Sequence, residues 1–599
     1  MNNNDRINLI HRISEIEGLS DKERSALLGL LRESKTYGLV WEDKPEAMEE
    51  RLRDELPVLT EVKERALISK DKDAPNHILI EGDNLEALTT LAYTHAGRID
   101  VIYIDPPYNT GNKDFVYNDS FVDREDTYRH SKWLSFMSRR LRIAKQLLSD
   151  KGVIFISIDD NEQAQLKLLC DEVFGEKNFV ANIIWKSKSG GANDTSAIAT
   201  DHEYALVYCR DIKNLSLNND KEAIVTTSYN KQDEKGRYSL DRLDKQSLGY
   251  QPSLDFPIIG PDGREYVVEH KNPYNKKARW RWGKDTVRER YDELVFIYPY
   301  VYTKNYEKKD GQKPRSILID ERFGRTRTGS TILRSIIGQQ NIFTYPKPTN
   351  LIIYLLSIST STTSTILDFF AGSGTTLHAT MQLNAKDGGH RQCILVTNNE
   401  NSICENVTYE RNKRVIEGYT TPKGDKVEGL RHNNLRYYKT NFVPREPNNR
   451  NKRALVAAAT DLLCVKNDVY QEQACFGGRK LKPTAARYFD DGKTQMLIIY
   501  NELAVDAFVR VIAGMEAGGR IKVYVFSNNR YAYADNFESV ADKVEVCALP
   551  AAIYDAYQKV LKPRKRNGNV PTADTPFAEE TTTEAEQGTF HFMEEGGEA

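Results

Sequence analysis

Short apolar runs alternate with amphipathic stretches in two separate parts of the chain. Apolar runs predict strands at 77–81, 100–104, 153–158, 179–185 and 203–208, and later at 365–368 and 393–397. Helical spacing of apolar residues predicts helices at 85–92, 128–149, 162–174 and 374–384. Strands that are apolar throughout are typical of a parallel sheet covered by helices on both faces. We therefore predict one doubly wound, mainly parallel α/β sheet that is interrupted by an insert.

Changes in this pattern mark the expected domain boundaries. The strand–helix alternation stops near Arg210 and resumes near Leu351, and the last residues are polar and acidic. The expected parts are a helical N-terminal region (1–75), the first half of the sheet domain (76–210), an insert (211–340), the second half of the sheet domain (341–442), a C-terminal α/β domain (443–562) and a disordered acidic tail (563–599).

Composition narrows the class of protein. With 599 residues, 39% hydrophobic and 28% charged, the chain has the balance of a globular protein with several domains. No apolar stretch approaches the ~20 residues of a membrane span, and the N-terminus lacks a signal-peptide pattern. Seven cysteines are scattered singly, which argues against a disulfide framework and a metal site. We expect a cytoplasmic protein. The net charge of −2 averages over basic and acidic segments, so it does not exclude a DNA partner.

The strand expected at 100–104 ends in Asp105-Pro106-Pro107-Tyr108. Asp105 offers a carboxylate acceptor and Pro106 a carbonyl acceptor. Pro107 stiffens the loop, and Tyr108 offers a flat ring. Two acceptors and a ring suit the exocyclic amino group of a nucleobase, held by two hydrogen bonds while the base stacks on the tyrosine. The alternative is a proline-rich turn without function.

A second strand–turn–helix junction reads Asp368-Phe369-Phe370-Ala371-Gly372-Ser373-Gly374. Its glycines allow a ligand to lie against backbone N–H groups, although they could also serve only a tight turn. No lysine follows Gly374, which disfavours a phosphate-binding loop. Asp368 suits a ligand with a positive amino group, such as S-adenosylmethionine. Glu400, after the next strand, can bind two ribose hydroxyls; a solvated loop carboxylate is the alternative.

Together the two motifs resemble those of DNA amino-methyltransferases, specifically the N6-adenine methyltransferases of the permuted order (beta class). In that family the Asp-Pro-Pro-Tyr loop precedes the target-recognition insert and the Phe-x-Gly-x-Gly loop follows it. The runs at 37–46, 103–111 and 343–348 are similar to those of the modification (Mod) subunit of type III restriction–modification systems. The chain departs from many relatives at Phe369, where they have proline.

The resemblance implies a Rossmann-like methyltransferase that transfers a methyl group from S-adenosylmethionine to N6 of a flipped-out adenine. The catalytic residues would be Asp105, Pro106, Pro107 and Tyr108, and the cofactor-binding residues Asp368, Phe370, Ala371, Gly372, Gly374, Glu400, Asp83 and Lys347. Asp83 would contact the cofactor's adenine, with a helix N-cap as the alternative. Lys347 would reach the cofactor's carboxylate, with a surface lysine as the alternative.

The insert carries the candidate DNA contacts, in which cations and aromatic residues interleave. These are Lys276, Lys277, Arg279, Trp280, Arg281, Trp282 and Lys284. Phosphate contacts would set affinity, and base contacts would set specificity. A solvated charged face is the alternative for each residue.

These expectations define a site-specific DNA adenine-N6 methyltransferase that serves as the modification and recognition subunit of a type III system. The resemblance implies double-stranded DNA as the substrate, a homodimer, and a separate helicase–endonuclease subunit, since this chain lacks the G-x-x-x-x-G-K-[ST] pattern for ATP. One alternative is an orphan amino-methyltransferase acting on adenine N6 or cytosine N4. Another is a sequence-specific DNA-binding protein without catalysis, against which the intact Asp105, Tyr108, Gly372 and Gly374 argue.

Overall fold

The structure is a computed structural model in which two compact units are distinguished. It describes residues 39–561 and 593–594, except 113, 119, 191–197, 224–228, 271, 273, 308–309, 340–341, 517–518 and 528–532. The insert unit comprises Asn218–Pro314, and the main unit comprises the rest of the chain. The apolar positions that predicted N-terminal helices before residue 39 lie outside the described residues, as does the expected acidic tail apart from 593–594.

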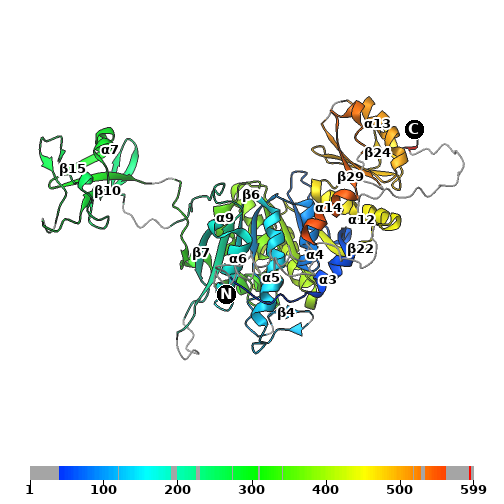
Figure 1. The fold of residues 1–599 in the computed structure, drawn as a ribbon, viewed down its shortest axis with the longest axis horizontal. Coiled ribbons are helices and arrows are strands. Elements are labelled where there is room, and N and C mark those ends of the chain that lie inside the picture. Colours follow the sequence, from blue (N-terminus) through cyan, green and yellow to red (C-terminus); the bar gives the residue numbers. More distant parts are fainter. Residues whose placement is uncertain are drawn as a thin grey trace, which may run out of the picture. The chain divides into compact units, whose positions relative to one another are not determined.

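A ten-stranded sheet organises the main unit (Figure 1). Its strands, in spatial order, are β1 (Glu55–Glu61), β22 (Asn434–Pro444), β2 (Asn76–Glu81), β19 (Gln392–Thr397), β18 (Thr365–Asp368), β3 (Ile99–Ile104), β6 (Leu148–Ile158), β8 (His202–Cys209), β7 (Phe179–Lys186) and β17 (Ile317–Leu318). The strands from β22 to β6 pair in parallel, whereas β1 and β8 pair antiparallel with their neighbours. The predicted mainly parallel sheet is confirmed, and it contains all the strands expected from the sequence.

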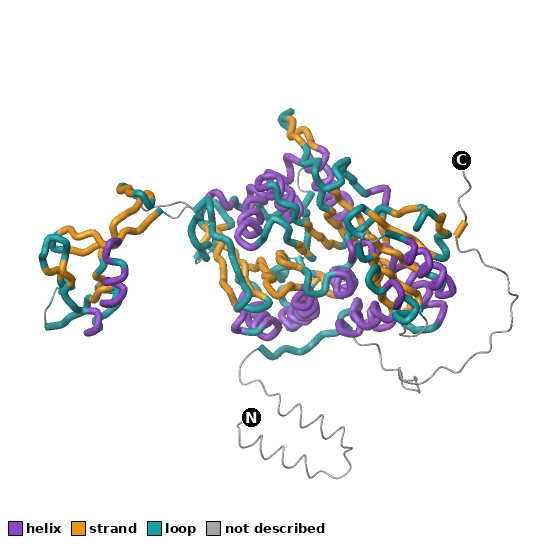
Figure 2. The backbone as a smooth tube through the Cα atoms, turned by 90° about the horizontal axis from the view of Figure 1, so that it is seen from above, coloured by secondary structure: helices purple, strands orange, loops and turns teal. Residues whose placement is uncertain are grey.

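Helices cover both faces of this sheet (Figure 2). One face packs against α4 (Asn84–Thr94), α5 (Arg129–Leu147) and α6 (Gln163–Phe174), and the other against α8 (Thr326–Ile337), α9 (Thr349–Ser359), α10 (Thr375–Asp387) and α11 (Glu410–Glu417). Because side chains alternate along a strand, Ile102 and Ile104 of β3 enter the first core while Val101 and Tyr103 enter the second. None of the helices in the described ranges combines the length and apolarity needed to cross a membrane.

The N-terminal region departs from the predicted all-helical structure. Its described part contains α3 (Ala47–Asp54), but β1 follows directly and pairs with β22 at the edge of the sheet. Leu56, Val58 and Leu59 are buried there, and Pro57 is tolerated because an edge strand needs fewer backbone donors. The prediction of helix is therefore wrong for residues 55–61.

The insert unit has a core of its own. Its elements are β9 (Lys231–Asp233), β10 (Gly236–Arg242), β11 (Asp244–Lys245), β12 (Ile258–Ile259), β13 (Glu265–Tyr266), β14 (Arg279–Trp280), α7 (Lys284–Glu289), β15 (Leu294–Ile297) and β16 (Tyr300–Tyr306). This unit spans fewer residues than the predicted insert of 211–340. The C-terminal part of that range contains α8, whose Leu333, Ile336 and Ile337 pack into the core of the main unit.

The C-terminal segment of the main unit forms a further α/β layer. A five-stranded sheet contains β23 (Glu472–Gln473), β26 (Ala486–Asp490), β27 (Gln495–Ile499), β28 (Ile521–Phe526) and β29 (Val544–Leu549), with helices α12 (Asn449–Asn467), α13 (Val505–Gly514) and α14 (Ala551–Val560). Helices α12 and α14 share one apolar core with α4 and β1, and the Tyr557 hydroxyl donates to the Pro57 carbonyl at 2.7 Å. Within the expected tail, Met593–Glu594 form a short strand, β30, that pairs with β25 (Arg479–Leu481), so this dipeptide departs from the predicted disorder.

Strand order brings the two sequence motifs together. Strands β3 and β18 are parallel neighbours, with Val101 opposite Ile366 and Ile102 opposite Leu367. Their carboxyl ends therefore meet at one edge of the sheet, and β19 pairs with β18 on its other side. Open α/β sheets bind their ligands at this edge.

Candidate active site

A cavity of about 2010 Å³ opens at this edge. Of the predicted catalytic and cofactor residues, those lining it are Asp105, Pro106, Pro107, Tyr108, Phe370, Gly372, Glu400, Asp83 and Lys347. Cavities for one small ligand usually measure roughly 300–1,000 Å³, so this one has room for two. Asp368, Ala371 and Gly374 do not line it.

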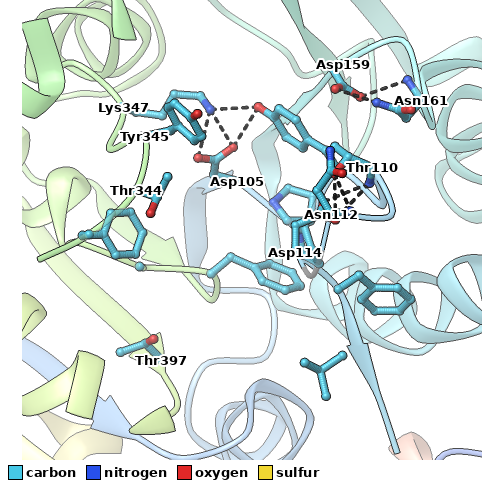
Figure 3. A pocket seen from close by; sticks show the side chains of 18 of the residues that line it. Asp105, Thr110, Asn112, Asp114, Asp159, Asn161, Thr344, Tyr345, Lys347 and Thr397 are labelled. Atoms are coloured by element: carbon cyan, nitrogen blue, oxygen red, sulfur yellow. Dashed lines mark hydrogen bonds and ion pairs between the residues drawn. The ribbon is translucent and has the colours of Figure 1, made fainter. Parts of the chain in front are cut away.

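Four polar side chains meet on one wall of the cavity. The Lys347 ammonium lies 2.9 and 3.0 Å from the two carboxylate oxygens of Asp105 (Figure 3). It also lies 2.8 Å from the Tyr108 hydroxyl and 3.1 Å from Glu203 Oε2. The Tyr108 hydroxyl in turn lies 3.0 Å from Asp105 Oδ1 and 3.0 Å from Glu203 Oε2. We call Asp105, Tyr108, Glu203 and Lys347 the acidic cluster.

The two carboxylates of the acidic cluster shift the pKa of both Lys347 and Tyr108. Burial alone would lower the pKa of Lys347, but the carboxylates of Asp105 and Glu203 outweigh burial and hold this pKa above its usual range. Burial, and then the negative charge of Asp105 and Glu203, hold the pKa of Tyr108 well above its usual range. The lysine is therefore charged and the tyrosine neutral at physiological pH, and two carboxylates face one ammonium.

The loop that carries Asp105 and Tyr108 is anchored from behind. The indole N–H of Trp133, on α5, donates to the Pro107 carbonyl at 2.7 Å. Asn109 is fully buried with a φ of 56°, and its side chain donates to Glu162 at 2.5 Å. His130 contacts the same oxygen of Glu162 at 2.7 Å. These contacts fix the backbone on both sides of Tyr108, so its ring has a defined position.

The glycine-rich loop after β18 is shaped by Asp368, which is buried. Its Oδ1 accepts from the Phe370 backbone N–H at 3.0 Å, and its Oδ2 accepts from the Thr376 hydroxyl at 2.5 Å. Burial raises the pKa of Asp368 to about 7, although these two hydrogen bonds oppose the shift. The structure thus corrects the prediction that Asp368 faces the ligand's amino group, because its carboxylate is directed into its own loop.

The two glycines of this loop have different roles. Both have a positive φ, 48° at Gly372 and 72° at Gly374, where side chains are strained. A Cβ on Gly372 would lie 3.0 Å from the Phe343 ring at the cavity wall, whereas one on Gly374 would lie 2.4 Å from the Asn412 side chain. Gly372 therefore keeps the cavity open, and Gly374 allows close packing behind the loop. Ala371 is buried beside them.

The part of the cavity near this loop suits the methionine and adenosine portions of S-adenosylmethionine. Phe343, Phe370 and Phe136 line it and are only partly buried. Asp83 and Glu400 add carboxylates to the lining of the same cavity. Asp83 also caps α4, accepting from the Leu85 backbone N–H at 2.7 Å, so the N-cap is formed while the residue also lines the cavity. Glu400 is exposed at the rim, where a ribose hydroxyl could reach it.

The predicted DNA contacts fall into three groups within the insert unit. Lys276, Lys277 and Lys284 are exposed, although Lys276 forms an ion pair with Asp255 at 2.7 Å. Trp280 is 1% exposed, and its indole N–H donates to the Phe256 carbonyl. Trp280 is therefore corrected from a predicted DNA contact to a core residue. The remaining three have internal partners: Arg279 contacts Gln251, Arg281 contacts Thr303 and Asp241, and Trp282 lies under Arg290.

The sequence reasoning missed Glu203 as a functional residue. It lies at the start of β8, a strand expected from the sequence, but the sequence does not give the direction of that strand in the sheet. Because β8 runs antiparallel to β6, with Ile158 opposite Tyr204, its first residues lie at the carboxyl edge of the sheet. One signal could have identified Glu203: an acidic residue at the start of a strand that pairs antiparallel with the parallel part of the sheet.

Comparison with known proteins gives consistent matches. The family model described as DNA methylase (N6_N4_Mtase) matches residues 99–419. The type II methyltransferase M.KpnI of Klebsiella pneumoniae is 37% identical over 368 residues, which is 58% of this chain and 87% of that protein. The type III EcoP15I Mod subunit of Escherichia coli is 32% identical over 467 residues, 68% of this chain and 70% of that protein. The type III EcoPI Mod subunit of Escherichia phage P1 is 35% identical over 439 residues, 64% of this chain and 66% of that protein.

The sheet, with its acceptor loop and glycine-rich loop at one edge, defines a methyltransferase of the Rossmann-like type. The family match covers more than half of the sequence, and M.KpnI is similar to the chain over most of its own length. The chain belongs to the DNA methylase family. The predicted family, fold and enzyme class are thereby confirmed, with S-adenosylmethionine as the methyl donor.

Proposed function

We propose that this chain is a site-specific DNA adenine-N6 methyltransferase and the modification and recognition subunit of a type III restriction–modification system. The observation that carries this proposal is the position of two loops on adjacent strands. Asp105, after β3, and Gly372, after β18, line one cavity with room for a donor and a base. The similarity to the EcoPI and EcoP15I Mod subunits supports the assignment to a type III system.

In this proposal the Asp105 loop activates the target amine. The lone pair of adenine N6 is delocalised into the ring, so the amine is a poor nucleophile. Asp105 and the Pro106 carbonyl each accept one N6–H, which favours tetrahedral geometry at nitrogen. S-adenosylmethionine, when bound, supplies an electrophilic methyl group. Extruding the base from the duplex costs a few kcal/mol, and stacking on Tyr108 returns roughly 1–3 kcal/mol.

The donor is held by the second loop and its neighbours. The Phe343 and Phe370 rings provide apolar contacts, and Gly372 leaves room beside them. Asp83 and Glu400 provide carboxylate acceptors for the adenosine part. Lys347 does not belong to this set, because its three N–H groups are directed to Asp105, Tyr108 and Glu203.

We further propose that the insert unit reads the DNA sequence and that the protein acts as a homodimer with a separate helicase–endonuclease subunit. Exposed Lys277 and Lys284 can contact phosphates. Lys276 contributes less, since Asp255 already offsets its charge.

A second candidate is a solitary methyltransferase without a nuclease subunit. It is favoured by the similarity to M.KpnI, a type II methyltransferase. Mixing the purified chain with the product of a neighbouring helicase–nuclease gene separates the two functions. Co-elution and ATP-dependent cleavage of unmethylated DNA support the type III function, and failure to associate supports the solitary enzyme.

The test of methylation uses tritium-labelled donor and double-stranded DNA, with mass spectrometry of the released nucleosides. We expect N6-methyladenine from the wild-type chain. The Asp105→Ala variant should bind DNA with nearly unchanged affinity but transfer at least about 100-fold more slowly, the lower range for loss of a group that handles a reacting proton. Labelling of cytosine N4 would change the assigned base, and full activity of Asp105→Ala would refute the role of this residue.

A further inference from the structure

The Tyr108 hydroxyl lies midway between two carboxylates. It is 3.0 Å from Asp105 Oδ1 and 3.0 Å from Glu203 Oε2. A phenol carries one hydrogen and can also accept, so it can donate to only one of the two carboxylates at a time. Lys347 donates to the same oxygen at 2.8 Å, which leaves one acceptor position on the hydroxyl. While the hydroxyl donates to Glu203, it can accept a proton from Asp105.

We propose that Glu203 is the final acceptor of the proton that leaves the target amine, and that this proton reaches it from Asp105 through the Tyr108 hydroxyl. This inference rests on the proposed function, since it concerns the proton released by methyl transfer to an exocyclic amine. It gives Tyr108 a second role besides stacking, and it gives Glu203 a role that the sequence motifs do not contain.

Methyl transfer to the amine precedes the proton transfer. The nitrogen lone pair forms the N–C bond to the methyl group while the S–C bond breaks, and the sulfur keeps that electron pair. The methylated nitrogen then carries a positive charge and gives one proton to the Asp105 carboxylate. Asp105 passes a proton to the Tyr108 oxygen as the tyrosine's own hydrogen moves to Glu203. Asp105 and Tyr108 return to their starting states, and Glu203 becomes neutral until it releases the proton to water.

The charges of the acidic cluster favour this path. Two carboxylates and one ammonium carry a net charge of −1 beside a nitrogen that becomes positive, and after the transfer they carry none. Burial and the two carboxylates raise the pKa of Tyr108 well above its usual range, so the hydroxyl does not ionise at neutral pH. The two hydrogens therefore move together. Glu203 retains some exposure, 18% of its side chain, so it can exchange its proton with water in the cavity.

Other ionisable groups surround the acidic cluster. Glu203 interacts electrostatically with Tyr103 and Asp159. Asp105 interacts with Tyr103 and Asp368. The pKa of Tyr103 is raised well above its usual range by burial, and the pKa of Asp159 is raised by burial as well. Asp159 and Asp368 therefore contribute to any measured pH profile, and each variant below is compared with wild type at every pH.

The test uses the full-length chain and three variants. Glu203→Gln keeps a carbonyl that accepts from Tyr108 but cannot take a proton, and Tyr108→Phe keeps the ring but removes the hydroxyl. Their double variant tests whether the two residues act on one path. The matched control is Asp171→Asn, which alters a carboxylate that contacts the Tyr208 hydroxyl at 2.7 Å and Lys167 at 2.7 Å, outside the cavity.

Three measurements separate the relay from a structural role. Single-turnover methylation should be at least about 10-fold slower at pH 7 in each single variant, and its rate should recover as the pH rises because hydroxide takes the proton instead. The double variant should be no slower than the slower single variant, as expected for residues that act together. The fluorescence of 2-aminopurine at the target position, measured without methyl donor, should match wild type and Asp171→Asn.

The results that would refute the relay differ from the result that would refute the proposed function. A wild-type rate in Glu203→Gln, or single effects that multiply in the double variant, refutes the relay. Loss of the 2-aminopurine signal in Glu203→Gln also refutes it, because Glu203 would then only position Tyr108. Failure of the wild-type chain to methylate any exocyclic amine refutes the proposed function instead, so the two failures are distinguishable.

Discussion

Lys347 and Asp105 form an ion pair at 2.9 Å, although 242 positions separate them in the sequence. The sequence suggested that this lysine reaches the carboxylate of the methyl donor. The structure instead directs it to the catalytic carboxylate, to Tyr108 and to Glu203. Its ammonium joins the two carboxylates and the tyrosine hydroxyl in one hydrogen-bonded group.

Replacing Lys347 by methionine should therefore lower activity by about 100-fold, the loss expected when a catalytic group is misplaced by roughly 1 Å. Without the ammonium, the Asp105 carboxylate and the Tyr108 hydroxyl lose a hydrogen-bond partner that holds them in place. Single-turnover rates check this. Lys151→Met, at an exposed position near the other end of β6, should behave as wild type, and a wild-type rate in Lys347→Met would contradict the explanation.

Replacing Gly372 by alanine should weaken donor binding at least about 10-fold in calorimetry. The new methyl group would lie 3.0 Å from Phe343 at the cavity wall. Gly388→Ala is the matched control, because Gly388 also has a positive φ, 68°, but has no atom within 4 Å of the added Cβ. Both variants carry similar backbone strain, so equal donor affinities in the two variants would exclude Gly372 from the donor site.

Glu162 should make stability fall as the pH rises. Burial raises its pKa to about 8, above the ordinary value of 4.5. A raised folded-state pKa means that the neutral carboxyl group contributes fully below about pH 4.5 and that this stability is lost as the pH rises to about 8. Glu162→Gln should therefore melt roughly 2–5 °C higher than wild type at pH 8.5 and nearly equally at pH 5. Thermal unfolding at both pH values checks this, and the exposed Glu64→Gln should follow wild type throughout.

Two neighbouring lysines of the insert unit should differ in their effect on DNA affinity. Lys277 is exposed, whereas Lys276 forms an ion pair with Asp255. Lys277→Ala should weaken binding and reduce the slope of log affinity against log salt by about 1, as expected for one lost phosphate contact. Lys276→Ala should change the slope less. Fluorescence anisotropy at several salt concentrations measures both, and identical slopes for Lys277→Ala and wild type would remove this residue from the interface.

The local pattern of the chain is sufficient to predict most of the fold. Apolar strands and amphipathic helices are short-range features, so the strands that carry Asp105 and Asp368 are recognisable from a few residues each. The loop motifs are also local, since a proline pair and two glycines act through their own backbone. The class of enzyme follows from these two motifs and their order.

Other properties depend on which strands become neighbours. No local pattern shows that β3 lies beside β18, that β1 forms a sheet edge, or that β8 runs antiparallel and places Glu203 next to Tyr108. Burial is equally a long-range property: Trp280 looks like a DNA contact in a basic run, yet the insert unit packs around it. Strand pairing and burial arise from contacts between distant segments, and a side chain acquires its partner and its charge state only when those segments meet.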